Sequence, residues 1–183
     1  MQVRTTLLAG VKILTPKVHA DTRGILIEQY HQQRYQEAGI DSPFVQFNYT
    51  QSKENVLRGL HLQLKRPQGK LVFVTQGCIF DVVVDINPQS PTFMQHVSVY
   101  LSADNRRQLW VPPGYAHGFL VLSTQAQCHY FFTEHYDPAD QAGIYYQDPQ
   151  LAIPWPKATP ILSARDQQLP SLQQFLQQQN QKV

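Results

Sequence analysis

The stretch KLVFVTQGCIFDVVVDI, residues 70–86, decides the fold class of this chain. It holds two apolar runs, at residues 70–76 and 78–86, and Gly77 separates them. Both runs are rich in Val, Ile and Phe, which pack well on the pleated surface of a sheet. Short runs of this composition between turn residues predict β-strands.

Similar runs follow at residues 96–101, 109–111 and 118–122, between clusters of Pro, Gly, Asn and Asp. Because no helical segment alternates with them, the pattern does not predict a parallel sheet. The spacing favours a β-sandwich or a barrel. Asp81 and Asp85 are four residues apart in one predicted strand and therefore share a face, where we expect a structural role such as pairing with an arginine.

Helical patterns are confined to two short segments. QYHQQRYQEA, residues 29–38, is predicted to form a helix that Gly39 ends. SLQQFLQQQN, residues 171–180, has Ser171 as its expected N-cap and apolar residues along one face. We find no linker and no internal repeat. The sequence therefore predicts one all-β domain, residues 1–183, with a few short peripheral helices.

The composition excludes several classes of partner. The net charge is +2 and the pI is near 8.5, but no basic run exceeds two residues, so we expect no nucleic acid. Residues 1–14 lack the apolar core of a signal peptide and no long apolar stretch follows, so we expect no membrane segment and a cytoplasmic location. Cys78 and Cys128 are expected to be buried thiols, with a disulfide left open.

Three segments place ionisable residues at strand edges or tight turns: VLRGLHLQ (56–63), QGKLVFVTQG (68–77) and VPPGYAHGF (111–119). In a β-sandwich, such residues can point into the open mouth between the sheets. Their order resembles the cupins, in which a metal is usually held by a His-x-His pair, a Glu and a distant His. This resemblance implies a cupin-type β-sandwich, or jelly roll.

The metal ligands of the cupin pattern are largely replaced. Gln63 stands where a second His would follow His61, and Lys70 stands in place of the Glu, while His117 remains. Two histidines and a cation make a poor site for a divalent metal, so we expect no metal. A fixed ammonium suits the stabilisation of an oxyanion or an enolate instead. Each residue alone is more often structural, but their joint spacing favours function.

RGLH, QGKLV, the run G-x-x-F-D-V-x-V-D-I and PPGYAHGF together resemble the signature blocks of the dTDP-4-dehydrorhamnose 3,5-epimerase family. The resemblance spans roughly residues 15 to 170 in one unbroken order, which a chance match would not do. Further matching blocks are DTRG (21–24) with Glu28, FVQFN (44–48), Tyr130 with Tyr136, GIYYQDP (143–149) and LSARD (162–166).

The resemblance implies a role for each matching residue. His61 matches the general base, Asp166 the carboxylate that orients it, Tyr130 the general acid and Lys70 the cation near the sugar carbonyl. Tyr136 matches the aromatic side chain that stacks on the thymine. The positions implied to contact the nucleotide sugar are Arg23, Glu28, Gln46, Phe47, Asn48, Arg58, His117, Gln141 and Arg165. The family also implies a dTDP-sugar substrate and a homodimer, and an open sandwich with exposed edge strands has a reason to pair.

The implied reaction converts dTDP-4-keto-6-deoxyglucose into dTDP-4-keto-L-rhamnose by inversion at C3 and C5, in the synthesis of dTDP-rhamnose for surface polysaccharide. A ketone at C4 acidifies the flanking C–H bonds, so the reaction needs a base, an acid on the opposite face and an electrophile for the enolate oxygen. Neutral His is the natural base near pH 7, and Tyr can serve as the donor. No cofactor is required.

The sequence departs from the family pattern at Phe47, Phe131, Gln141 and Tyr146, which we expect to fall on the binding shell. Two alternatives therefore stay open. One is an enzyme on the same scaffold that inverts a single carbon or shifts the ketone of a related dTDP-4-keto-6-deoxysugar. The other is a cupin that only binds a sugar or that uses a metal, which the missing metal ligands disfavour.

Overall fold

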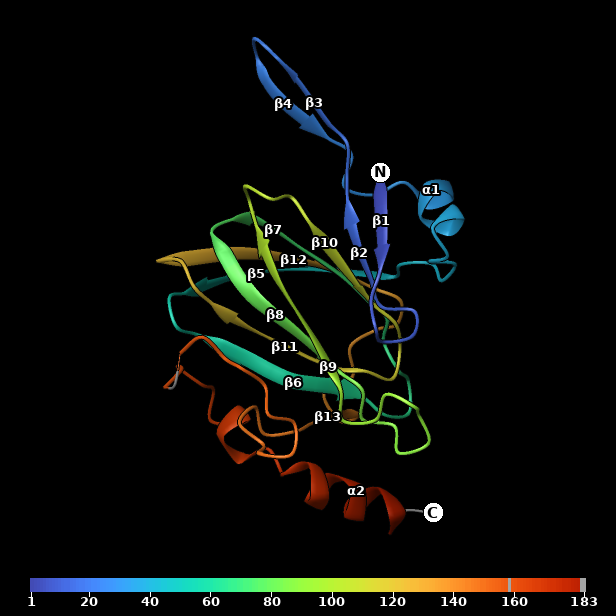
Figure 1. Cartoon of the computed structure of the whole chain (residues 1–183), viewed down its shortest axis with the longest axis vertical. Helices are drawn as coiled ribbons and strands as arrows, with labels where there is room; N and C mark the ends of the chain where they lie inside the picture. Colours follow the sequence, from blue (N-terminus) through green and yellow to red (C-terminus); the bar gives the residue numbers. More distant parts are fainter. Residues whose placement is uncertain (158, 182–183) are drawn as a thin grey trace.

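The computed structural model describes residues 1–157 and 159–181 and is built around two antiparallel sheets (Figure 1). The first sheet has six strands, in the order β1 (Gln2–Thr5), β2 (Lys12–Thr15), β10 (Gln108–Val111), β7 (Lys70–Gln76), β12 (Gln125–Phe132) and β5 (Gln46–Lys53). The second sheet has five, in the order β13 (Gln141–Gly143), β6 (Leu57–Gln63), β11 (Ala116–Val121), β8 (Cys78–Val84) and β9 (His96–Ser102).

From β5 onward, the chain passes repeatedly between the two sheets. Strands β5, β7, β10 and β12 lie in the six-stranded sheet, while β6, β8, β9, β11 and β13 lie in the five-stranded sheet. Neighbouring strands in each of the two sheets are therefore distant in sequence, except in the consecutive pairs β1–β2 and β8–β9. This arrangement confirms the predicted β-sandwich, and its two sheets can bring residues from the whole chain to one space.

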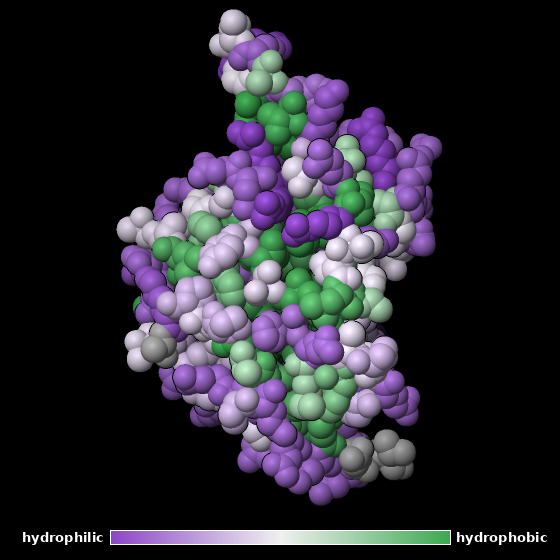
Figure 2. Space-filling model, viewed as in Figure 1, coloured by the Kyte–Doolittle hydropathy of each residue, from purple (hydrophilic) through white to green (hydrophobic). Residues whose placement is uncertain are grey.

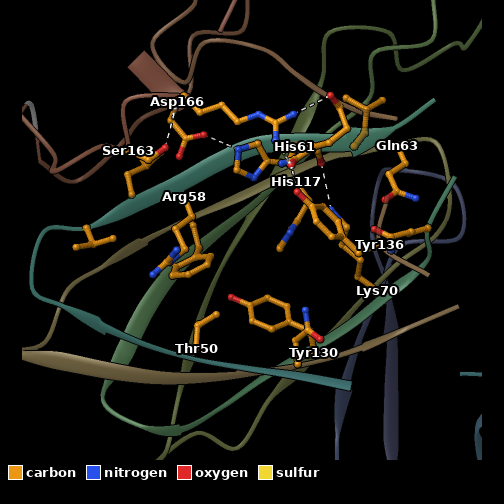
Figure 3. Close-up of a pocket in the computed structure, with 18 of the residues that line it drawn as sticks. Thr50, Arg58, His61, Gln63, Lys70, His117, Tyr130, Tyr136, Ser163 and Asp166 are labelled. Atoms are coloured by element: carbon orange, nitrogen blue, oxygen red, sulfur yellow. Dashed lines mark hydrogen bonds and ion pairs between the residues drawn. The ribbon is translucent and has the colours of Figure 1, made fainter. Parts of the chain in front are cut away.

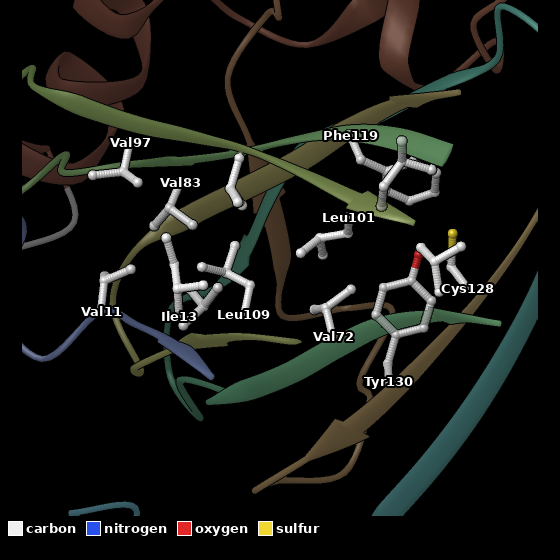
Figure 4. Close-up of a cluster of buried hydrophobic side chains, with 14 of the residues drawn as sticks. Val11, Ile13, Val72, Val83, Val97, Leu101, Leu109, Phe119, Cys128 and Tyr130 are labelled. Carbon is white, nitrogen blue, oxygen red and sulfur yellow. The ribbon is translucent and has the colours of Figure 1, made fainter. Parts of the chain in front are cut away.

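The core between the sheets is built from alternate residues of the central strands. On β7 and β8, Val72 and Val83 point inward and contact a cluster that also contains Leu101, Leu109 and Phe119 (Figure 4). The intervening residues point to the outer faces of the sheets, as the period of two in a strand requires. This apolar core fills one end of the sandwich, and the side chain of Tyr130 lies at its border with the pocket described below.

Helices cover parts of the outer faces. Helix α2 (Leu172–Asn180) packs Leu172 and Phe175 onto the five-stranded sheet, and Ser171 caps it through a capping box with Gln174. The predicted helix over residues 29–38 is shorter in the structure. Helix α1 (Gln32–Glu37) buries Tyr35 against the six-stranded sheet. Both helices are peripheral, as predicted.

The sequence patterns did not predict the first four strands. β3 (Val18–Asp21) and β4 (Gly24–Ile27) form a hairpin that projects from the body of the molecule (Figure 1). Ile25 and Leu26 are 56% and 66% exposed on it, and Figure 2 shows apolar surface along this arm. Such strands lack the alternation of buried and exposed residues by which a half-buried strand is recognised.

The expectation that Asp81 and Asp85 lie on one strand and face an arginine is wrong. Strand β8 ends at Val84, and Asp85 turns back to accept hydrogen bonds from the hydroxyls of Ser90 and Thr92. Asp81 is fully buried and pairs with a histidine of the neighbouring strand. Both carboxylates are held by local partners that the spacing of the sequence did not reveal.

Candidate active site

A cavity of about 650 Å³ opens between the two sheets, at the end of the sandwich that the apolar core leaves free (Figure 3). Its walls come from β5, β7 and β12 of one sheet and from β6 and β11 of the other, and residues 161–166 close one side. The volume suits a small organic ligand. Most of the residues implicated by the sequence line this cavity: Asn48, Arg58, His61, Lys70, His117, Tyr130, Tyr136, Gln141, Arg165 and Asp166.

A local irregularity in β6 brings Arg58 and His61 to the same wall. Residues three apart on a regular strand face opposite sides. Here the pairing of β6 with β11 shifts register between His117 and Phe119. Gly59 has a φ of +124°, and a side chain on it would meet the backbone of Gly118 at 2.6 Å. This close approach requires glycine and re-aims the neighbouring side chains, as bulges beside active sites often do.

His61 and Asp166 form a hydrogen-bonded pair across 105 residues of sequence. The Nε2 atom of His61 lies 2.5 Å from Oδ1 of Asp166. Burial raises the pKa of Asp166, but the hydrogen bonds from His61 and Ser163 outweigh it and leave the pKa below its ordinary value. An ionised carboxylate can only accept, so Nε2 carries the proton. The other ring nitrogen, Nδ1, is therefore the one that can act as a base.

Tyr130 faces this pair from the opposite sheet. Its side chain points inward from β12, and its ring stacks on Phe132 at a centroid distance of 5.9 Å. Burial raises its pKa well above the ordinary value. Within the described part of the chain, its hydroxyl has no hydrogen-bond partner. A buried phenol that keeps its proton and has no partner is equipped to donate to a ligand.

Lys70, at the start of β7, places an ammonium group beside the histidine. Nζ donates to the backbone oxygen of His61 at 3.2 Å. The residue is 7% exposed, and burial lowers the pKa of its ammonium to about 8, partly opposed by the charge of Asp81. The group is therefore protonated at neutral pH but weakly solvated, and such a cation interacts strongly with an anion in the cavity.

Two further residues of the cavity wall are fixed by short polar side chains. Nε2 of His117 lies 2.8 Å from Oδ1 of the fully buried Asp81. The Nε atom of Arg58 donates to Oγ of Ser52 at 3.1 Å, and Arg58 lines the cavity. Guanidinium groups held in this way suit the oxygens of a diphosphate.

Gln63 holds the segment that carries Tyr136 in place. The sequence had indicated this residue only as the replacement of a cupin metal ligand. The Nε2 atom of Gln63 donates to the backbone oxygens of Arg66 and His135 at 3.0 and 3.2 Å, and its Oε1 accepts from the backbone N–H of Asp137 at 2.7 Å. Gln63 is 3% exposed. A polar side chain with three backbone partners in a buried position defines the course of the loop.

Side chains on both sides of Tyr136 complete this wall. The side-chain oxygen of Gln46 accepts from the backbone N–H of Tyr136 at 2.8 Å. Oε1 of Gln141 accepts from the Tyr136 hydroxyl at 2.7 Å and from Arg165 at 2.6 Å. Gln46 also donates to Asn48 at 3.0 Å. These five residues, all implicated by the sequence, therefore form one hydrogen-bonded group.

Four of the implicated residues do not line this cavity: Gln46 is connected to it only through its hydrogen bonds to Tyr136 and Asn48, and the other three lie away from it. Arg23 is on the projecting hairpin and pairs with Asp21, and Glu28 pairs with Arg34. Phe47 is 51% exposed on the outer face of the six-stranded sheet, because the side chains of β5 alternate and its neighbours in sequence point inward. None of the three reaches the cavity of its own chain.

The expectation that all the departures from the family pattern fall on the binding shell is wrong for three of the four, because Phe47, Phe131 and Tyr146 do not line the cavity of this chain. Phe131 follows Tyr130 on β12 and points to the outer face, where its ring packs against Phe44 and Phe47. Tyr146 is 5% exposed and packs against Trp155 under the five-stranded sheet. Only Gln141 of the four departures lines the cavity.

Among the residues that the structure describes, no group of three or more His, Cys, Asp and Glu side chains is arranged to hold a metal ion. Cys78 and Cys128 are unpaired, and Cys128 is buried. In residues 1–157 and 159–181, no helix has the length and apolar character needed to cross a membrane.

The fold and the cavity define a cupin-type β-sandwich with a site suited to acid–base catalysis. A His–Asp pair and a tyrosine face each other across this site. A lysine occupies the position at which the cupin pattern has a metal ligand. A family model described as dTDP-4-dehydrorhamnose 3,5-epimerase matches residues 5–174. The chain belongs to this family.

Individual relatives match nearly the full length. The dTDP-4-dehydrorhamnose 3,5-epimerase of Salmonella typhimurium is 48% identical over 179 residues, which is 96% of this chain and 98% of that protein. A 3-epimerase of Streptomyces niveus is 39% identical over 169 residues, 91% and 82% of the two chains. The crystal structure of dTDP-6-deoxy-D-glucose-3,5-epimerase from Legionella pneumophila with dTDP-4-keto-L-rhamnose has a TM-score of 0.91 and 46% identity, covering 94% and 93%.

Proposed function

We propose that this chain catalyses the epimerisation of dTDP-4-keto-6-deoxyglucose at C3 and C5, which gives dTDP-4-keto-L-rhamnose for dTDP-rhamnose synthesis. The observation that carries the proposal is the position of His61 and Tyr130 on facing sheets, with the ammonium of Lys70 beside the histidine. Relatives described as 3,5-epimerases are 44–48% identical over nearly the whole chain, which supports it.

His61 is the base in this proposal. The C4 ketone acidifies the C–H bonds at C3 and C5, and Nδ1 of His61 takes a proton from one face of the sugar ring. Asp166 holds the proton on Nε2 and stabilises the imidazolium that forms, as carboxylates do for other catalytic histidines. The charge left on the substrate moves to the C4 oxygen and gives an enolate.

Lys70 and Tyr130 complete the exchange of protons. The ammonium of Lys70 lies in a desolvated position, where it stabilises the enolate oxygen. Tyr130 then donates its phenolic proton to carbon from the opposite face, which inverts the centre. The imidazolium afterwards loses its proton to solvent and the phenolate regains one from solvent, so the enzyme returns to its starting state.

The nucleotide is proposed to lie along the wall formed by Arg58, His117, Tyr136 and Arg165. The guanidinium groups of the two arginines suit the diphosphate. Tyr136 is 47% exposed, and its ring can stack on the thymine base. Gln141 and the amides of Gln46 and Asn48 supply neutral hydrogen-bonding groups beside it. We assign these residues to substrate binding.

We propose that the protein is a homodimer, in which Arg23, Glu28 and Phe47 can contribute to the cavity of the second copy. The projecting hairpin carries Arg23 and two exposed apolar residues, so it is suited to pack on a second copy. The outer face of the six-stranded sheet presents Phe47 and Tyr49, which are 51% and 48% exposed. Apolar and aromatic surface of this kind marks interfaces. The hairpin of one protomer then delivers Arg23 to the cavity of the other, together with Glu28, which follows the hairpin in sequence.

The reaction is proposed to need no metal. Gln63 stands at a cupin ligand position, but within the described residues its side chain hydrogen-bonds only to backbone groups. Lys70 would repel a divalent ion from a second ligand position. Dialysis against a strong chelator should therefore leave the turnover rate unchanged. A large loss that one added metal restores would contradict this proposal.

We also propose a cytoplasmic location, which the unpaired cysteines support.

Incubation of the protein with dTDP-4-keto-6-deoxyglucose in deuterated water tests the proposed activity. Solvent deuterium should appear at both C3 and C5, with inverted configuration at each. Because a 3-epimerase is among the relatives, inversion at a single carbon is the alternative outcome and would assign the chain to the mono-epimerases. No incorporation at either carbon would reject both assignments.

A further inference from the structure

The cavity contains a second buried hydroxyl that neither the sequence motifs nor the proposed mechanism uses. Thr50 lines the cavity on β5, and Figure 3 shows its side chain beside the hydroxyl of Tyr130. The oxygens of both residues are buried, and neither makes a hydrogen bond of ordinary geometry within the described residues. Buried polar atoms without partners are rare and call for an explanation.

The sheet fixes the position of Thr50 relative to Tyr130. In the pairing of β5 with β12, Thr50 lies opposite Cys128, and Asn48 lies opposite Tyr130. Thr50 and Tyr130 are therefore diagonal neighbours on the inner face, at a separation that a long aromatic side chain can bridge. The Tyr130 ring is held in turn by Phe132 and by Phe119 at a centroid distance of 6.3 Å.

Protonation of the substrate carbon leaves a phenolate on Tyr130 in a place where water does not solvate it. Burial makes this anion costly and raises the pKa of the phenol, while the Thr50 hydroxyl and the charge of Arg58 act in the opposite direction. Thr50 is a nearby neutral hydroxyl donor that has no other partner in the described chain, and it is a stronger donor than the neighbouring thiol of Cys128. Hydrogen bonds at catalytic groups are often loose in the free enzyme and tighten as charge develops.

We propose that Thr50 is a positioning residue that donates a hydrogen bond to the phenolate oxygen of Tyr130 as this residue gives its proton to the substrate. The inference rests on the proposed epimerase function. The O–H proton of Tyr130 forms the new C–H bond, its electron pair stays on the phenolic oxygen, and the proton of Thr50 remains on Thr50. Solvent then restores the phenol, so no further reactant is needed.

Thr50→Val removes the hydroxyl and keeps the shape of the side chain. Loss of a hydrogen bond to an anion should lower the rate of inversion by about tenfold to a hundredfold. The wash-in of solvent deuterium without inversion depends on His61 and should stay within about twofold of wild type, as should the KM. Thr50→Ser keeps the donor and should restore inversion. Both rates are measured on the same sample in deuterated water.

A merely structural role for Thr50 would lower exchange and inversion together, and that outcome would overturn the inference. Unchanged inversion in Thr50→Val would also overturn it, as would a raised KM with unchanged turnover, which would make Thr50 a substrate contact. If Thr50→Val does not fold, Thr50→Ala gives the same comparison. Thr5→Val is the matched control, because Thr5 is exposed on β1 at the opposite edge of the same sheet. A wild-type protein that inverts neither carbon would reject the proposed function instead.

Discussion

At the scale of single residues, the chemistry depends on Lys70, whose charged side chain is buried and therefore destabilises the folded state. The folded structure lowers the pKa of Lys70 to about 8, against an ordinary value of about 10.4. The folded chain therefore binds fewer protons than the unfolded chain between about pH 8 and 10, and the contribution of Lys70 to stability rises with pH in that window. At pH 7 the charged side chain costs the folded state about 3 kcal/mol.

Lys70→Met should separate function from stability. Turnover should fall at least about a hundredfold because the enolate loses its counter-charge. The melting temperature at pH 7 should be unchanged or higher, since the substitution removes a buried charge. Calorimetry and a turnover assay measure the two effects. Lys53→Met, at an exposed position of β5, should change neither. A large drop in melting temperature for Lys70→Met would show that the lysine stabilises the fold instead.

The sequence predicted most of the catalytic group but not its surroundings. His61, Lys70 and Tyr130 occupy positions with family motifs around them, and all three line one cavity. Thr50 carried no signal, and Gln63 was noticed only as the replacement of a cupin metal ligand. The roles of these two residues depend on buried groups that belong to other strands and loops. The sequence around a single threonine or glutamine does not show which groups will surround it in the fold.

At the scale of elements, the site depends on β6, which supplies the base and the brace of the Tyr136 loop. Gln63→Leu removes three hydrogen bonds to the backbone of residues 66, 135 and 137. The loop should loosen, and the affinity for dTDP should fall by about tenfold, corresponding to about 1.4 kcal/mol. Deuterium exchange at saturating substrate should change by less than about threefold, because the position of His61 is kept.

Titration calorimetry with dTDP measures the affinity of the Gln63→Leu protein. Gln33→Leu is a suitable control, since Gln33 lies exposed on α1 and its side chain, among the described residues, hydrogen-bonds only to Glu37 of the same helix. An unchanged dissociation constant would show that the loop holds its position without Gln63. A collapse of exchange at saturating substrate would place the effect of Gln63 on the chemistry rather than on binding.

The elements themselves were predicted unevenly. β7 covers the predicted residues 70–76, and β9 to β11 lie within about two residues of their predicted bounds. β1, β3 and β4 were missed, because exposed strands with no buried face show no hydrophobic alternation. β2, which buries the consecutive residues Ile13 and Leu14, also shows no alternation. The predicted runs did not cover β5, β6, β12 and β13 either. The register shift at Gly59 and Gly118 was also not predicted, since it depends on the close approach of two backbones from distant parts of the chain.

At the scale of the whole molecule, the projecting hairpin predicts that two inactive variants restore activity when they form a mixed dimer. Arg23→Ala and His61→Asn should each have little activity as homodimers. When the two are unfolded together and reassembled, each mixed dimer should contain one complete site, because the intact hairpin of the His61→Asn chain serves the intact cavity of its partner. Activity should therefore recover on mixing.

This recovery distinguishes two arrangements of the hairpin. If the hairpin served the cavity of its own chain, each chain in the mixed dimer would carry one defect and no complete site would form. The absence of recovery, with mixed dimers verified by a mass tag, would contradict the proposed exchange of Arg23 between protomers. A protein that sediments as a monomer at assay concentration would reject the dimer itself.

The central claim is that His61 removes the proton and Tyr130 returns one from the opposite face. The most direct test measures deuterium wash-in and product stereochemistry on the same samples of His61→Asn and Tyr130→Phe. His61→Asn should lose wash-in at C3 and C5 alike, because the mechanism assigns the removal of both protons to His61, and wash-in that persists would assign it to another group such as His117. Tyr130→Phe should keep the wash-in, while inverted product falls by about 10² to 10⁴-fold. A Tyr130→Phe protein that inverts both carbons at nearly the wild-type rate would contradict the account.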